Sequence, residues 1–146
     1  MSEPVEARYQ AILKRYWGYD SFRPLQLDAI KSIASGQDTL VLMPTGGGKS
    51  IIYQVPTLAS TGVCIVITPL IALMKDQVDR LRKHRILAEA IHAGRSHREI
   101  DRILDNCIYG DVKFLYISPE RIDSEMFRMR CARMDVALIA VDEAHC

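Results

Sequence analysis

The sequence MPTGGGKS, at residues 43–50, is the stretch that decides the fold. Consecutive glycines let backbone N–H groups turn inward around a phosphate chain, and a helix that starts just after them adds the positive end of its dipole. In this interpretation Lys49 neutralises the outer phosphates and Ser50 holds Mg²⁺. Met43 stands where the usual pattern has its first glycine, so a simple turn followed by a solvated lysine is the competing interpretation.

Composition indicates an ordinary globular domain. The chain has 146 residues, of which 49% are hydrophobic and 25% are charged, and no apolar run approaches the ~20 residues of a membrane span. The N-terminus lacks the order of a signal peptide. We therefore expect a cytoplasmic protein, nucleoid-associated in a bacterium or nuclear in a eukaryote, with no membrane partner. The net charge of +1 does not by itself argue for nucleic acid. Four scattered cysteines without a C-x-x-C pair fit neither a zinc site nor a disulfide framework.

Apolar periodicity predicts an α/β fold. Helical spacing predicts helices at residues 5–16 and 24–35, with a third beginning at residue 51. Near-continuous apolar strands separated by further helices predict a parallel sheet covered by helices on both faces. The predicted strands are at residues 39–42, 63–67, 88–92, 114–117 and 136–141, and the helices between them at 70–82, 97–109 and 124–129.

A second chemical signal follows the last predicted strand, which we expect to be central in the sheet. Asp142 can complete the coordination shell of a magnesium ion, and Glu143 beside it can orient and deprotonate a water molecule. Ligands of open α/β sheets bind at the carboxyl ends of the strands, where this pair and the glycine loop both fall. A solvated strand end is the alternative for the acidic pair alone. Of the dispersed histidines, only His145 lies in a context that suggests a function.

Residues 142–145 read DEAH and resemble the DEAH box of superfamily 2 helicases. Together with other segments in matching order, they make the chain similar to the first RecA-like lobe of RecQ-type DNA helicases. The resemblance implies a P-loop NTPase fold of the RecA-like kind. It also implies that residues 1–146 form one ATP-binding domain, within which residues 1–36 are the helical motif 0 region.

The resemblance implies which residues form the nucleotide site. Residues 19–26 resemble motif 0, in which the glutamine, here Gln26, reads the adenine edge while Tyr19 and Arg23 pack on its face. A glutamine amide can both donate to and accept from adenine, which favours ATP over GTP. Motif I of these helicases tolerates Met43, and its resemblance implies nucleotide contacts from Thr45, Gly46, Gly47, Gly48, Lys49 and Ser50.

Two further stretches resemble motifs that contact DNA. Residues 68–77 are similar to motif Ia, and residues 117–121 to motif Ib. Without the resemblance, the first stretch is simply a helix opened by Pro69, and the second is a strand end followed by a turn. The implied DNA contacts are Thr68, Pro69, Leu70, Ser118, Pro119, Glu120 and Arg121.

The resemblance implies a complete motor larger than this sequence. It would bind ATP and Mg²⁺ between this lobe and a second RecA-like lobe that carries an arginine finger, with Lys49, Asp142 and Glu143 as catalytic residues and His145 coupling nucleotide state to later motifs. It would unwind DNA with 3′ to 5′ polarity at single-strand and duplex junctions, in recombination or repair. We expect residues 1–146 to hydrolyse ATP negligibly by themselves. The alternatives are a non-catalytic nucleotide-binding module and a P-loop phosphotransferase such as a small nucleotide kinase.

Overall fold

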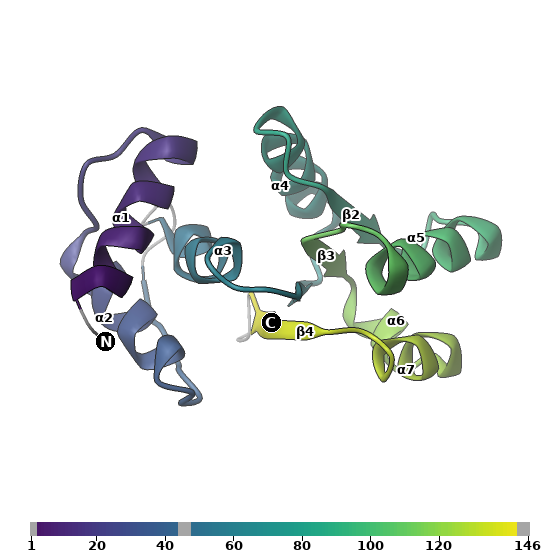
Figure 1. Ribbon diagram of the computed structural model, residues 1–146. Helices are drawn as coiled ribbons and strands as arrows, with labels where there is room; N and C mark the ends of the chain where they lie inside the picture. The colour runs from purple at the N-terminus through teal and green to yellow at the C-terminus, as the bar shows by residue number, and fades with distance from the viewer. Residues whose placement is uncertain (1–2, 44–47, 143–146) are drawn as a thin grey trace. The chain divides into compact units, whose positions relative to one another are not determined.

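The chain divides into two compact units, residues 1–60 and residues 61–146 (Figure 1). The computed structural model describes residues 3–43 and 48–142. Each unit has its own core, and each is described by itself.

The first unit is a cluster of helices. It contains α1 (Glu3–Trp17), α2 (Pro24–Ala34) and α3 (Lys49–Leu58). Apolar residues at helical spacing face one another, and among them Leu13, Ile30 and Val55 are fully buried. Pro24 opens α2, where its missing N–H needs no partner. The helices predicted from periodicity are therefore confirmed, with ends that differ by one or two residues.

The strand predicted at residues 39–42 is wrong: the structure shows no strand there. Leu40 and Leu42 are 80% and 82% exposed, whereas Val41 and Met43 pack against the helical core. The alternating sequence is suited to a strand, but a strand forms only where its backbone groups find a neighbouring ladder. No ladder pairing of residues 39–43 is present in the described part of the chain.

The second unit is built on a four-stranded parallel sheet with the order β2-β3-β1-β4. Its strands are β1 (Val63–Ile67), β2 (Ala88–Ile91), β3 (Phe114–Ile117) and β4 (Val136–Val141). Every residue of β3 is buried, as is expected of a parallel strand with both faces covered. The parallel α/β fold predicted from the sequence is thus confirmed.

Helices lie on both faces of this sheet (Figure 1). On one face α4 (Ile71–Lys83) packs against β2 and β3. On the other, α5 (His97–Tyr109) and α7 (Glu125–Cys131) share a core with alternate residues of the strands, including Ile65, Leu115 and Ile117. A short helix, α6 (Pro119–Ile122), was not predicted. It forms a single turn with Pro119 at its first position.

The last strand lies at an edge of the sheet and not in its centre, which corrects the expectation for β4. Its residues alternate between half-buried and exposed, and Ile139 and Val141 are 57% and 58% exposed. An apolar run alone could not distinguish an edge strand from a central one, because both are Val- and Ile-rich in such sheets. Among the described residues, no helix is long and apolar enough to cross a membrane.

Candidate nucleotide and nucleic-acid site

The start of α3 carries the described end of the glycine loop. Gly48 has a left-handed conformation with φ = 80°, and the helix begins at the next residue, Lys49. Ser50 lies in the first turn, and all three residues are half-buried. The first N–H groups of a helix have no partners within it and suit an anion. Thr45, Gly46 and Gly47 lie outside the described residues.

Gln26 is brought directly to this loop. Its side chain is only 3% exposed, and its amide nitrogen Nε2 donates a hydrogen bond to the Gly48 carbonyl oxygen at 3.2 Å. Its Oε1 accepts a hydrogen bond from the backbone N–H of Arg23 at 2.9 Å, which caps α2. The structure therefore joins two stretches, motif 0 and the glycine loop, that are 22 residues apart in the sequence.

The other two residues expected around the base are on the surface of the same unit. Tyr19 lies in the segment between α1 and α2 and is 56% exposed, and Arg23 precedes α2 with an exposed side chain. Lys14 and Asp20 form an exposed ion pair nearby, at 3.4 Å. An exposed aromatic ring and a guanidinium group are available for stacking on a planar ligand.

The carboxyl ends of the four strands form the second candidate region, which we call the carboxyl edge. Backbone N–H groups just beyond the strands donate to the neighbouring strand: Ser118 to Ile91 at 3.1 Å, Thr68 to Ile117 at 3.1 Å, and Asp142 to Ile67 at 2.9 Å. In parallel sheets this is where ligands bind. The residues that follow the strands, and define the carboxyl edge, are His92, Ser118, Thr68 and Asp142.

The residues that resemble motifs Ia and Ib thus lie on neighbouring strands. Thr68 is fully buried and accepts a hydrogen bond from the Leu70 N–H through Oγ1. Because of this turn α4 begins at Ile71, so Pro69 does not open the helix as expected. Ser118 is 1% exposed, and its hydroxyl is without a hydrogen-bond partner in the described chain. Leu70 and the other nearby side chains, Pro69, Pro119 and Glu120, are exposed.

Arg121 reaches from α6 to the loop after β2, where its guanidinium donates to the Ala93 carbonyl oxygen at 3.4 Å. Arg95, in that loop, donates to the Ala90 carbonyl oxygen at 3.1 Å and pairs with Glu99 at 3.1 Å. Arg121 is half-buried, and its hydrogen bond to Ala93 links two connections of the sheet.

His92 has a positive environment. Partial burial lowers the pKa of its imidazole, and the charges of Arg95, Lys75 and Arg121 lower it further, while Glu99 acts in the opposite direction. Sequence analysis did not single out His92 or Arg95, because neither belongs to a spaced motif. The position of His92 at the end of a strand, with Arg95 in the loop that follows, was the signal that could have pointed to them.

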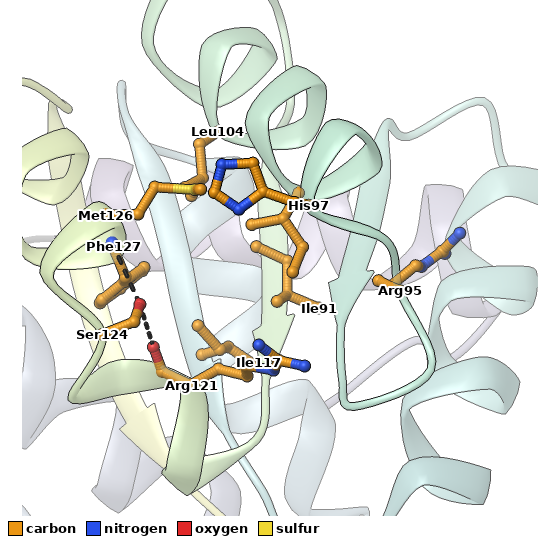
Figure 2. A pocket seen from close by; sticks show the side chains of 10 residues that line it. Ile91, Arg95, His97, Leu104, Ile117, Arg121, Ser124, Met126 and Phe127 are labelled. Carbon is orange, nitrogen blue, oxygen red and sulfur yellow. Dashed lines mark hydrogen bonds between the residues drawn. The ribbon is translucent and has the colours of Figure 1, made fainter.

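Two surface depressions lie beside His92, Arg95 and Arg121. One, of about 300 Å³, lies between α5, α6 and α7 (Figure 2). Most of its lining residues are apolar, including Ile117 and Phe127, and Arg121 and His97 also line it. The other, of about 350 Å³, is more polar and is lined by Lys75, His92 and Arg95 among others.

Asp142 is half-buried at the end of β4. Glu143 and His145, the other two residues of the DEAH stretch with an expected role, lie outside the described residues. Ser50 belongs to the first unit and Asp142 to the second. Ser50 has a hydroxyl oxygen and Asp142 has carboxylate oxygens, and each is a type of ligand that Mg²⁺ takes.

Comparison with known proteins shows the family of the chain. Residues 23–146 match the family described as DEAD/DEAH box helicase. The chain is 47% identical over 140 residues to ATP-dependent DNA helicase RecQ of Bacillus subtilis, covering 95% of the chain and 24% of that protein. It is 42% identical over 136 residues to the Haemophilus influenzae protein of the same name, with coverage of 93% and 22%. It is also 38% identical over 149 residues to ATP-dependent DNA helicase Q5 of Mus musculus, with coverage of 97% and 15%.

The chain therefore spans about a quarter or less of the length of these relatives. The family match covers most of the chain, including the described end of the glycine loop and the carboxyl edge. This chain belongs to the DEAD/DEAH box helicase family.

Proposed function

We propose that the chain is the ATP-binding lobe of a RecQ-type ATP-dependent DNA helicase. The observation that carries the proposal is the hydrogen bond from Gln26 to Gly48, because it joins the two stretches that are proposed to bind the base and the phosphates. The identity to RecQ helicases, over more than nine-tenths of the chain, supports it.

At the proposed nucleotide site, each residue would contact a particular part of ATP, the magnesium ion or the attacking water. The amides of residues 46–48 and the Lys49 ammonium would hold the phosphates, as the loop composition suits. Ser50 and Asp142 would ligate Mg²⁺, which when bound neutralises charge on the phosphate oxygens. Glu143 would orient the attacking water and accept its proton. Tyr19, Arg23 and Gln26 would bind adenine, Thr45 would contribute to nucleotide binding, and His145 would couple nucleotide state to the rest of the motor.

Single-stranded DNA would lie along the carboxyl edge of the second unit. Phosphate contacts position a strand without reading its sequence, and they come from cations, hydroxyls and backbone amides. Arg121, Lys75 and Arg95 supply the cations here: Lys75 and Arg95 line one depression with His92, and the charges of all three lower the pKa of His92. Ser118 has a hydroxyl without a hydrogen-bond partner among the described residues, and because it is buried, a phosphate would contact it only if the residues that cover it moved. Thr68, Pro69, Leu70, Pro119 and Glu120 complete the proposed contact surface.

The complete protein would bring a second RecA-like lobe against this one. Closing and opening of the two lobes with each ATP hydrolysed would move the motor 3′ to 5′ along a strand and separate duplex at a junction. Recombination or repair would be the setting, in the cytoplasm of a bacterium or the nucleus of a eukaryote.

The test of the nucleotide site is DNA-stimulated ATP hydrolysis by the full-length protein. Lys49→Ala and Glu143→Gln should each lower the stimulated rate at least about 100-fold, because each removes a group that acts on the transferred phosphoryl group or its attacking water. Lys14→Ala is the matched control, since Lys14 is an exposed lysine paired with Asp20, and it should leave the rate unchanged. Phosphorylation of a small nucleotide without DNA stimulation would instead favour a phosphotransferase. Nucleotide binding without any hydrolysis would favour a non-catalytic module.

The DNA surface has a separate test in the salt dependence of binding. Arg121→Ala should weaken binding of an oligo-dT strand and reduce the slope of log affinity against log salt by about 0.7, the value for one phosphate contact on a single strand. Arg128→Ala is the control, because Arg128 is an exposed arginine of the same unit that pairs with Asp123. Equal slopes for the two variants would remove Arg121 from the proposed contact surface.

A further inference from the structure

The turn that ends α4 has an arginine where the backbone favours glycine. Arg85 has φ = 61°, and in the described part of the chain it is the only residue besides glycines with a positive φ. The Ile86 N–H donates to the Leu81 carbonyl oxygen at 3.0 Å. The Arg85 N–H donates to the Arg82 carbonyl oxygen at 2.9 Å, and the two bonds form the Schellman pattern of a helix end. Glycine usually takes this left-handed position, because a side chain there crowds the next carbonyl oxygen.

The side chain of Arg85 does not account for the turn. Leu81 and Ile86 are 2% and 6% exposed, so apolar packing anchors the chain on both sides of the turn. Arg85 itself is exposed, and its guanidinium has no hydrogen bond or ion pair to another described residue. A residue that strains the backbone and does not support the fold indicates that its side chain has another task.

Two further cations lie in the last turns of α4. Arg80 and Lys83 are exposed, and neither forms an ion pair with another residue that the structure describes. They are three positions apart, so they are neighbours on the helix surface and repel each other. The helix dipole favours cations in a last turn, but it does not explain an arginine at a left-handed position beyond the helix. We call Arg80, Lys83 and Arg85 the basic turn.

The acidic residues of this unit leave the basic turn with an excess of positive charge. Glu89 is already paired with Arg82 at 2.7 Å. Asp79 lines the polar depression beside the carboxyl edge. Asp111 and Asp135 precede β3 and β4, whereas the basic turn joins α4 to β2, which is an edge strand of the sheet. An exposed group of cations without carboxylate partners suits a polyanion.

The basic turn and the carboxyl edge are at opposite ends of β2. The basic turn precedes Ala88, where β2 begins, and His92 follows the last residue of the strand. Four residues of a strand span about 13 Å. A single strand of DNA that lies along the carboxyl edge therefore does not also pass over the basic turn. A polyanion bound at the basic turn is a separate segment.

We propose that the basic turn binds the phosphate backbone of duplex DNA, as a second contact besides the single strand at the carboxyl edge. The inference rests on the proposed helicase function, whose substrate has both a single strand and a duplex. Duplex DNA has one phosphate charge per about 1.7 Å of its axis, so each of the three cations can meet a phosphate. Such contacts hold the duplex in place without reading its sequence.

The experiment measures binding of the full-length protein to a duplex with a 3′ oligo-dT tail and to the oligo-dT strand alone, by fluorescence anisotropy at several salt concentrations. Arg85→Gly removes one cation and supplies the residue that the turn favours. It should weaken binding of the tailed duplex and reduce the slope of log affinity against log salt by about 0.9, the value for one phosphate contact on duplex DNA. Binding of oligo-dT alone should not change.

Arg102→Ala is the matched control, because Arg102 is an exposed arginine of α5, on the other face of the sheet, and also has no ion pair to a described residue. It should change neither binding measurement.

The stability of the same variant tests the argument from strain. Arg85→Gly should leave the midpoint of urea unfolding unchanged or raise it, because relief of the left-handed conformation offsets the freedom that glycine gains in the unfolded chain. A lower midpoint would mean that the arginine stabilises the turn, and it would overturn the inference.

Unchanged affinity of Arg85→Gly for the tailed duplex would also overturn the inference. Equal losses for the tailed duplex and for oligo-dT alone would place the single strand on the basic turn, and would equally contradict a separate duplex contact. Neither result affects the proposed function. That function fails if the unsubstituted protein binds no DNA and shows no DNA-stimulated ATP hydrolysis.

Discussion

His92 is held with its pKa below the usual histidine range, by partial burial and by the positive charges of Arg95, Lys75 and Arg121, against the opposing charge of Glu99. Its Nδ1 accepts a hydrogen bond from the Gly94 N–H at 3.1 Å, so the ring is fixed in the loop after β2. In the free protein the imidazole is therefore neutral at neutral pH. A DNA phosphate bound among these cations would add negative charge near His92 and so favour the protonated imidazole.

This predicts the sign of a pH effect on DNA binding. A bound phosphate raises the pKa of His92 toward or above its ordinary value of about 6.5, so binding takes up a proton. Affinity for single-stranded DNA should therefore increase as the pH falls from 8 toward and below the ordinary histidine range. Fluorescence anisotropy of a labelled oligo-dT strand, at constant ionic strength, measures this dependence.

His92→Gln is the control, because it keeps a polar side chain that cannot gain charge. It should flatten the pH dependence while retaining binding at pH 8. An equal rise in affinity at low pH for both proteins would assign the effect to other groups and remove His92 from the proposed phosphate surface.

At the level of single residues, sequence motifs singled out Gln26 and Lys49, whose roles stay predictions, but could not point to His92 or Arg95. Gln26 and Lys49 lie in stretches whose residue types and spacing resemble nucleotide-binding motifs. His92 and Arg95 come together with Lys75 and Arg121 only through the parallel register of β2 and β3 and the placement of α4 and α6. The bond from Gln26 to Gly48 was equally inaccessible, because it depends on how α2 packs on α3.

Among the helices, α7 is attached to α5 by a double ion pair. The guanidinium of Arg130 contacts the carboxylates of Asp101 and Asp105, which lie four residues apart on one face of α5. Its side chain is 23% exposed, so the contact is partly protected from solvent. The attachment also holds Phe127, which contributes to the core between the two helices.

Arg130→Ala should therefore destabilise the protein by about 1 kcal/mol, the upper end for ion pairs near a surface. Urea unfolding monitored by circular dichroism measures the change. Arg128→Ala, on the same helix, removes an ion pair to Asp123 whose partners are 67% and 83% exposed, and it should have an effect near zero. Equal loss in both variants would mean that the packing of arginine stems, and not the double ion pair, accounts for the stability.

Helices and strands were predicted well where the segment itself has a clear apolar pattern or a capping residue. β1, β3 and β4 have the predicted bounds, and so does α5, whose Ser96 hydroxyl accepts from the Glu99 N–H at its start. The failures have physical causes. Residues 39–42 have the alternation of a strand but no partner in the described chain, and α6 is too short for periodicity to detect.

For the molecule as a whole, the chemistry is divided between the two units. Lys49 and Ser50 belong to the first, whereas Asp142 and the carboxyl edge belong to the second. The sequence predicted that the glycine loop and the acidic pair form one site, and this stays a prediction. The edge position of β4 is a property of the assembled sheet, which is why an apolar run could not reveal it.

The last prediction concerns what residues 1–146 can do without the remainder of a motor. In P-loop enzymes an arginine supplied to the transferred phosphoryl group accelerates hydrolysis by about 10³- to 10⁵-fold. The proposed source of that arginine is a second lobe, since the resemblance to RecQ-type helicases assigns it there. The isolated 146-residue chain should therefore bind ATP with reduced affinity and hydrolyse it at least about 1000-fold more slowly than the DNA-stimulated full-length protein. Phosphate release measured for both proteins under the same conditions tests this, with Lys49→Ala in the 146-residue chain giving the background. Rapid turnover by the monomeric 146-residue chain, abolished by that substitution, would show that the lobe carries a complete catalytic site and that the proposed division of labour is wrong.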